Sequence, residues 1–94
     1  MTRETLLVLD ALSSAEQLSG AQIAKTAKLA SGTLYPILSR LERAGWLSSE
    51  WEIIPPEELG RPRRRYYRLS GVGAARARAA AQELHAPIGR LAWS

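Results

Sequence analysis

Within GTLYPILSRLERAGWLSSEWE, residues 32–52, a helical pattern gives way to an extended one. Four apolar residues recur at the spacing of one helix face: Leu34, Ile37, Leu38 and Leu41. This periodicity predicts an amphipathic helix over about residues 32–44, and Gly45 is a natural stop after it. From Trp46 the side chains alternate with period two, which predicts a strand. The segment therefore predicts a helix that leads directly into a strand.

Two shorter amphipathic helices are predicted before this segment. The first begins after Thr2, its predicted N-cap, and runs to about Ser13. The second follows Ser19 and runs to about Lys28. The link to the third helix is tight, and we expect Ser31 to cap that helix. Because the link is short, the third helix crosses the second steeply and presents its polar face to solvent.

A hairpin and a final helix are predicted after residue 45. The second strand covers about residues 64–69 and is separated from the first by the Pro- and Gly-rich turn 55–60. We expect Trp46 and Trp51 to pack within the hairpin. Ser70 then caps an alanine-rich helix that extends to about residue 86.

This order of elements predicts a mainly α fold with a small β-hairpin. Three helices, a two-stranded wing and a C-terminal helix form a winged helix-turn-helix domain. We assign residues 1–70 to the winged helix-turn-helix domain, and residues 71–94 to a C-terminal helix of the same domain that serves dimerisation.

The positive charge of the chain is concentrated in the second half of the hairpin. The chain has 13 Lys and Arg against 9 Asp and Glu, and a formal net charge of +4. Five of those 13 basic residues lie in one stretch without an acidic residue: Arg61, Arg63, Arg64, Arg65 and Arg68. A basic cluster on an otherwise balanced domain is typical of a site for a polyanion.

The exposed helix and the basic hairpin together predict binding to double-stranded DNA. A helix presented this way fits the major groove, and its polar side chains reach base edges and phosphates. The side chains available for this are Thr33, Tyr35, Ser39 and Arg40. The arginines of the wing, Arg61, Arg63, Arg64 and Arg65, suit the adjacent phosphates because guanidinium binds phosphate bidentately.

Three segments resemble the PadR-like family of transcriptional regulators. Residues 32–52 are similar to the recognition helix and first wing strand of that family. GRPRRRYYRLS, residues 60–70, is similar to the second wing strand, and LSGAQIAK, residues 18–25, to the second helix. The chain departs from the family at residues 19–21, where members often carry His-Gly-Tyr.

The resemblance implies a repressor that binds a palindromic operator as a homodimer. Carried over by position, it adds Pro36 to the DNA face, and Lys25 and Lys28 as contacts to the DNA backbone. It also implies dimerisation through the C-terminal helix and release from DNA by a small aromatic effector. Stripes of apolar residues along this helix give the expected dimer interface: Val72, Ala75, Ala79, Leu84, Ile88 and Leu91. Trp93 is a candidate contact for the effector.

Other classes of function find less support in the sequence. A winged helix that only docks another protein, or an anti-repressor, is the alternative to DNA binding, and RNA is a third possible ligand. We predict no enzymatic activity, catalytic residue or cofactor, because no nucleophile and base stand at a catalytic spacing. With one histidine and no cysteine, we expect no metal site. Lacking a signal peptide or membrane span, the chain is expected to be cytoplasmic.

Overall fold

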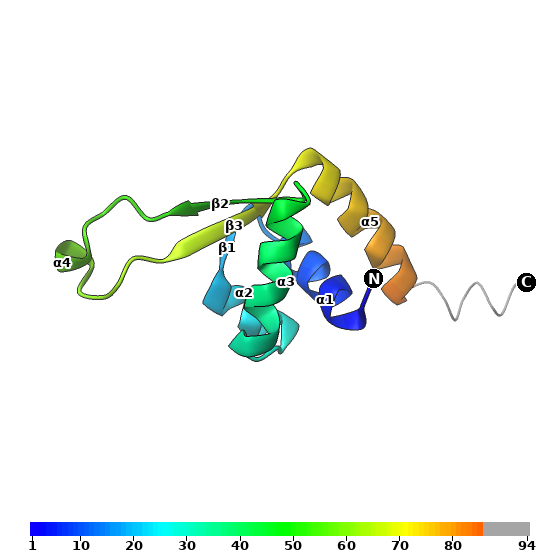
Figure 1. The fold of residues 1–94 in the computed structure, drawn as a ribbon, viewed down its shortest axis with the longest axis horizontal. Coiled ribbons are helices and arrows are strands. Elements are labelled where there is room, and N and C mark those ends of the chain that lie inside the picture. Colours follow the sequence, from blue (N-terminus) through cyan, green and yellow to red (C-terminus); the bar gives the residue numbers. More distant parts are fainter. Residues whose placement is uncertain (86–94) are drawn as a thin grey trace, which may run out of the picture.

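The computed structural model of the protein describes residues 1–85 and has the predicted order of elements (Figure 1). The first three helices are α1 (Arg3–Ser13), α2 (Gly20–Ala27) and α3 (Ser31–Arg43). The wing consists of β2 (Leu47–Trp51), the one-turn helix α4 (Pro56–Leu59) at its tip, and β3 (Arg65–Leu69). The final helix is α5 (Gly71–His85). The mainly α winged helix-turn-helix fold is therefore confirmed.

Side-chain caps begin two of the first three helices, and the cap of α1 was predicted. Thr2 accepts a hydrogen bond from the Thr5 N–H at the start of α1. Ser19 and Gln22 form a reciprocal capping box at the start of α2. The expectation for Ser31 is wrong, because α3 starts one residue earlier and Ser31 lies inside its first turn. Ala30 is the N-cap, and its backbone carbonyl accepts the first hydrogen bonds of the helix.

The wing belongs to a three-stranded antiparallel sheet with the order β1-β3-β2. The two-residue strand β1 (Leu18–Ser19) was not predicted, because it is too short to show a periodic pattern. It pairs with β3 through Leu18 opposite Tyr67 and Ser19 opposite Tyr66. This pairing ties the beginning of α2 to the base of the wing.

The hydrophobic core lies between the helices and the base of the wing. Its largest fully buried side chains are Val8, Leu9, Leu12, Ile23, Leu34 and Leu38. Tyr67 of β3 is also buried in this core. Trp46 packs against the core, but Trp51 is 59% exposed and the expectation that it packs within the hairpin is wrong. The wing projects beyond the helices (Figure 1), so the far end of β2 has no core to contact.

Helix α5 is held closely against the turn that follows α3. The Ser70 side chain donates to the Gly45 carbonyl (2.6 Å) and accepts from the Gly73 N–H (3.0 Å), so it caps α5 as predicted. A Cβ on Gly73 would collide with the carbonyl of Trp46. Ala77 and Ala80 bury the inner face of the helix. No helix within residues 1–85 combines the length and the apolar character needed to cross a membrane.

Candidate nucleic-acid interface

The outer face of α3 carries the five side chains of this helix that are expected to contact DNA. Its apolar stripe is buried in the core, and this leaves the opposite face in solvent. The exposed residues are Thr33, Tyr35, Pro36, Ser39 and Arg40. The division between the two faces follows from the 3.6-residue period of the helix.

Tyr35 occupies a position that depends on a glycine in α2. The phenol ring lies against the first residue of that helix, Gly20, where a Cβ would collide with the Tyr35 hydroxyl. Gly20 is itself buried, whereas Tyr35 keeps 45% of its surface exposed. The close approach of the two helices therefore places the hydroxyl of Tyr35 beside the start of α2.

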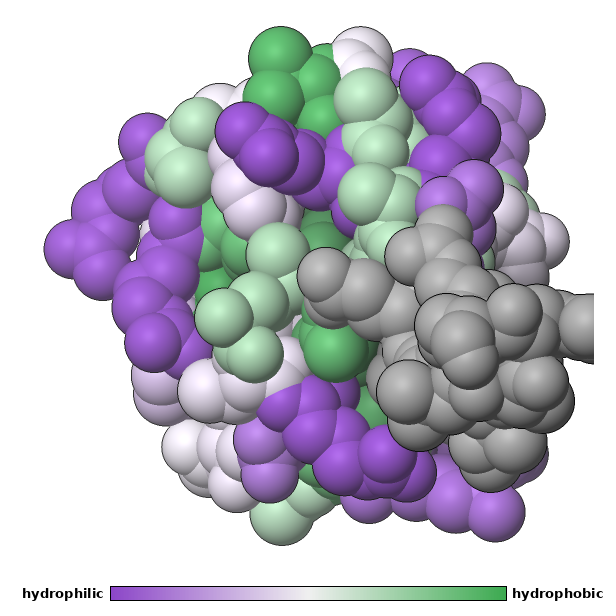
Figure 2. All heavy atoms as spheres, turned by 90° about the vertical axis from the view of Figure 1, so that its right-hand side faces the viewer, coloured by the Kyte–Doolittle hydropathy of each residue, from purple (hydrophilic) through white to green (hydrophobic). Residues whose placement is uncertain are grey.

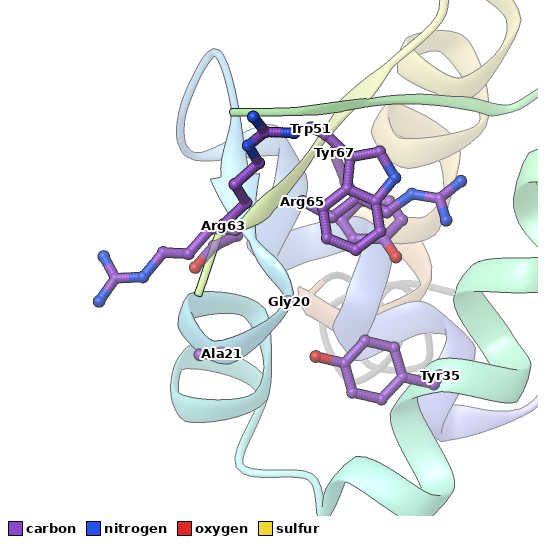
Figure 3. A pocket seen from close by; sticks show the side chains of 9 residues that line it. Gly20, Ala21, Tyr35, Trp51, Arg63, Arg65 and Tyr67 are labelled. Atoms are coloured by element: carbon purple, nitrogen blue, oxygen red, sulfur yellow. The ribbon is translucent and has the colours of Figure 1, made fainter. Parts of the chain in front are cut away.

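A hollow of about 480 Å³ joins α3 to the wing. Its lining consists of Ser19, Gly20, Ala21, Tyr35, Trp51, Arg63, Arg64, Arg65 and Tyr67. Figure 3 shows Tyr35 and Trp51 on opposite sides of this hollow, with Arg63 extending outward. The structure thus brings the recognition helix and three of the four predicted wing arginines to one concave surface. Burial raises the pKa of Tyr67, which also lines the hollow.

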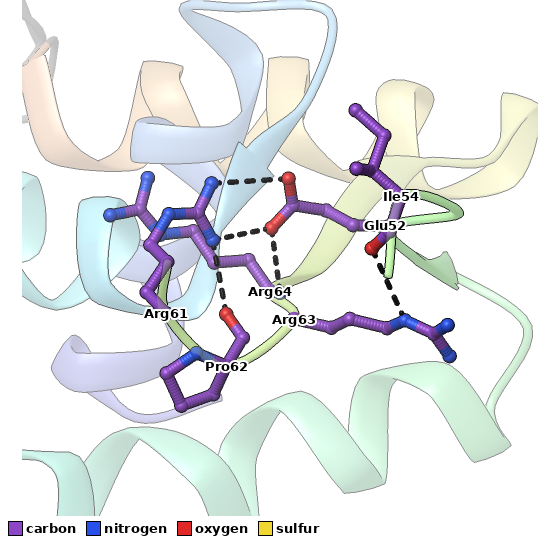
Figure 4. Close-up of polar contacts among 6 residues, drawn as sticks. All are labelled: Glu52, Ile54, Arg61, Pro62, Arg63 and Arg64. Atoms are coloured by element: carbon purple, nitrogen blue, oxygen red, sulfur yellow. Dashed lines mark hydrogen bonds and ion pairs between the residues drawn. The ribbon is translucent and has the colours of Figure 1, made fainter. Parts of the chain in front are cut away.

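One of the wing arginines, Arg61, is held by a carboxylate of its own chain (Figure 4). Its guanidinium donates to both oxygens of Glu52, at 2.7 and 3.1 Å. Glu52 also accepts a hydrogen bond of 2.7 Å from the backbone N–H of Arg64. Hydrogen bonding to Arg61 holds the pKa of Glu52 below its ordinary value. This clasp closes the loop at the base of the wing tip, so the charge of Arg61 is already neutralised.

Arg65 is also engaged within the chain. Its Nε donates to the Ser49 hydroxyl (2.9 Å), and the Ser49 hydroxyl donates to Glu42 of α3 (2.6 Å). Its Nη2 lies 3.3 Å from Glu42 Oε1, and its guanidinium stacks over the rings of Trp51 and Tyr67. The side chains of Arg65 and Glu42 are 40% and 33% exposed, so this ion pair adds little to stability.

Arg63 and Arg64 remain available on the surface of the wing. Both are exposed, and no ion pair within residues 1–85 involves either of them. The Arg63 Nε donates to the backbone carbonyl of Ile54 at 3.3 Å, and its terminal nitrogens have no acceptor among residues 1–85 (Figure 4). The predicted cluster of four wing arginines is thus divided into two that bind carboxylates of the chain and two that face solvent.

The remaining predicted contacts lie away from the hollow. Arg40 borders a second hollow of about 460 Å³, between the start of α1 and the end of α3. Lys25 is exposed on α2, and Lys28 is exposed at the C-cap of that helix, in a left-handed conformation with φ of 58°.

Sequence reasoning missed Glu42, Ser49, Glu52 and Gly20, which position the arginines and Tyr35. The acidic residues carried no signal, because their partners lie 9 and 23 positions further along the chain. Gly20 had one signal, since a glycine at the start of a helix is a site where another element approaches closely.

Comparisons with known proteins agree with this architecture. The chain matches the transcriptional regulator PadR-like family over residues 8–79, from α1 to α5. No curated protein sequence matches it. It is similar to the crystal structure of a PadR family transcription regulator from hypervirulent Clostridium difficile R20291. The identity is 26% and the TM-score 0.73, with 87% of this chain and 86% of that chain covered.

Two further solved structures share this fold. Reduced AbfR bound to DNA is 26% identical, with a TM-score of 0.69 over 87% of this chain and 57% of that one. Transcriptional regulator PA4135 is 19% identical, with a TM-score of 0.77 over 97% of this chain and 62% of that one, a likeness of fold alone. The chain thus spans about three fifths of the length of these two regulators.

The family match covers most of the chain and includes every element that lines the hollow. The fold is shared by regulators of transcription, and the family is one of transcriptional regulators and not of enzymes. The chain therefore belongs to the PadR-like family of transcriptional regulators.

Proposed function

We propose that the protein is a sequence-specific regulator that binds double-stranded DNA as a homodimer on a palindromic operator and represses transcription there. One observation carries this proposal. Tyr35 of α3 and Arg63 and Arg64 of the wing line the same concave surface, so one duplex can contact both elements at once. The AbfR structure, described as bound to DNA, supports it at 26% identity.

The elements divide the work of recognition between bases and phosphates. The exposed face of α3 enters the major groove, where Thr33, Ser39 and Arg40 reach base edges or flanking phosphates. Arg63 and Arg64 contact the backbone beside that groove, while Lys25 and Lys28 of α2 contact phosphates on its other side. Arg61 and Arg65 act indirectly, because their guanidinium groups are engaged by Glu52 and Glu42.

Helix α5 is the proposed dimer interface. Val72, Ala75 and Ala79 are exposed along one side of it in the single chain. Figure 2 shows this end of the molecule, where the coloured hydrophobic side chains lie between hydrophilic ones and form no broad patch. Leu84 belongs to the same helix, and Ile88 and Leu91 lie outside the described residues. Small side chains allow two helices to approach closely but bury little area, so we expect a dimer of moderate strength.

Release by a small aromatic effector completes the proposal. It rests on the resemblance to the family, and Trp93, the residue expected to contact the effector, lies outside the described residues. The cytoplasmic location expected from the sequence stays a prediction.

The test begins with selection of bound sequences from a random pool of duplex DNA, followed by anisotropy titration of the selected duplex. We expect the Arg63→Ala, Arg64→Ala double variant to bind it roughly 10- to 100-fold more weakly. The slope of log K against log salt should decrease by about 3.6 for the homodimer, because two arginines are lost from each protomer and each phosphate contact contributes about 0.9. Stability should change by less than about 0.5 kcal/mol, since both side chains are exposed.

Arg78→Ala is the control for loss of charge, because it removes one positive charge from an exposed position on α5, outside the hollow. Unchanged affinity of the double variant would contradict the proposed surface. A selection that enriches no sequence would favour a module that docks another protein.

A further inference from the structure

The contact between α3 and the wing has a geometry that DNA binding alone does not explain. Glu42 lies in the last turn of the recognition helix, and Ser49 and Arg65 lie on the two wing strands. The Ser49 hydroxyl is at the centre, 2.6 Å from Glu42 Oε2 and 2.9 Å from Arg65 Nε. Helix α3 and both wing strands are thus joined through this hydroxyl and through the direct contact of 3.3 Å between Arg65 Nη2 and Glu42 Oε1, and we call these three residues the brace.

The brace lies directly behind the surface assigned to DNA. The Arg65 guanidinium is 5.6 Å from the centre of the Trp51 ring and 5.7 Å from that of Tyr67, and all three residues line the hollow beside α3. Figure 3 shows Arg65 and Tyr67 behind the Trp51 ring. Because Trp51 is otherwise exposed and the wing projects beyond the core, the far half of the hairpin has few other contacts to fix its angle.

We propose that Glu42, Ser49 and Arg65 are positioning residues that hold the wing at a fixed angle to α3, and that sequence specificity depends on this angle. The inference rests on the proposed function. An aligned wing places Arg63 and Arg64 on their phosphates only when α3 is in register with its bases. A tilted wing keeps its charge and still binds any duplex, but its phosphate contacts no longer form preferentially on the operator sequence.

This role and a simple account based on charge predict different effects on DNA binding when Glu42 is removed. If Arg65 were a phosphate contact weakened by Glu42, removal of the glutamate would free it and tighten binding to every duplex. If the brace positions the wing, removal of Glu42 loosens the wing and lowers the preference for the selected sequence.

The experiment compares the affinity of each variant for the selected duplex and for a scrambled duplex of the same length. Ser49→Ala removes the hydroxyl at the centre of the brace without changing any charge, and leaves only the contact of 3.3 Å between Arg65 and Glu42. We expect the specificity ratio to decrease by about tenfold, the discrimination supplied by one base contact. Glu42→Ala should lower the ratio to a similar degree. The Glu42→Ala, Ser49→Ala double variant should lower the specificity ratio no further than either single variant, because both substitutions disrupt the brace.

Two matched controls lie on the same strand. Ser48 and Glu50 are exposed and alternate with Ser49, so they face away from the brace. Ser48→Ala and Glu50→Ala should leave the specificity ratio unchanged, although Glu50→Ala raises affinity for both duplexes slightly. Circular dichroism and thermal unfolding of each variant establish that it is folded before binding is compared.

The outcomes separate this inference from the proposed function. If the wild type binds no duplex, the proposed function fails and the inference fails with it. If the wild type prefers the selected duplex and Ser49→Ala keeps the same ratio, the inference alone is overturned. Tighter binding of Glu42→Ala to both duplexes, with a steeper salt slope and an unchanged specificity ratio, would likewise overturn it and assign Arg65 to direct phosphate contact.

Discussion

Gly73 marks the point where α5 comes closest to the rest of the molecule. A Cβ there would collide with the backbone carbonyl of Trp46, which cannot rotate away as a side chain can. We expect Gly73→Ala to lower the free energy of unfolding by about 1–3 kcal/mol, although alanine favours a helix more than glycine does. Urea unfolding followed by circular dichroism measures the change.

Gly71→Ala is the control for this substitution. Gly71 is in the same first turn of α5, and a Cβ on it would meet no atom within 4 Å. This variant should therefore be as stable as the wild type or slightly more stable. Equal stability of the two alanine variants would show that α5 can shift away from Trp46 at little cost.

The wing is the element whose shape depends most on a single carboxylate. Glu52 closes the loop 52–64 by binding the Arg61 guanidinium and the Arg64 N–H, and its pKa is lowered from 4.5, chiefly by the hydrogen bond to Arg61. A carboxyl group with a lowered folded-state pKa stabilises the fold at neutral pH, and this contribution is lost as the pH falls through that pKa. We therefore expect the wing tip to loosen only below pH 4.5.

NMR titration of the Glu52 side-chain carbon checks this expectation directly. The titration midpoint should lie below 4.5, and in a Glu52→Gln variant the Arg64 amide should lose its acid-dependent shift. A midpoint at or above 4.5 would show that the clasp is open in solution.

At the scale of the whole molecule, the main prediction is a homodimer built on α5. Light scattering of the protein should give twice the mass of the chain, and footprinting should give two half-sites about one helical turn, roughly 34 Å, apart. Ala79→Glu should give a monomer, because it places a charge on the exposed stripe of α5 without disturbing the buried Ala77 and Ala80. Glutamate also keeps a high helix propensity.

The control for the dimer is Ala15→Glu, which adds the same charge at an exposed position between α1 and β1. It should leave the mass unchanged. A wild-type monomer in the presence of the selected duplex would contradict the dimer and the palindromic operator together.

The amino-acid pattern was sufficient for the helices, the hairpin and the exposed face of α3. Each of these features depends on residues within a few positions of one another, such as the leucine stripe of α3 or the Ser70 cap of α5. Helices, strands and caps of this kind can therefore be predicted from local sequence before any tertiary contact is known.

Contacts between distant segments were decided by the folded structure alone. The two-residue strand β1 exists because β3 lies beside it, and Trp51 is exposed because the hairpin extends beyond the core. Contacts between distant segments also separate the four wing arginines into two that bind carboxylates and two that face solvent. Whether a guanidinium meets a carboxylate of its own chain or the solvent depends on strand register and on the angle of the wing, which no neighbouring residue specifies.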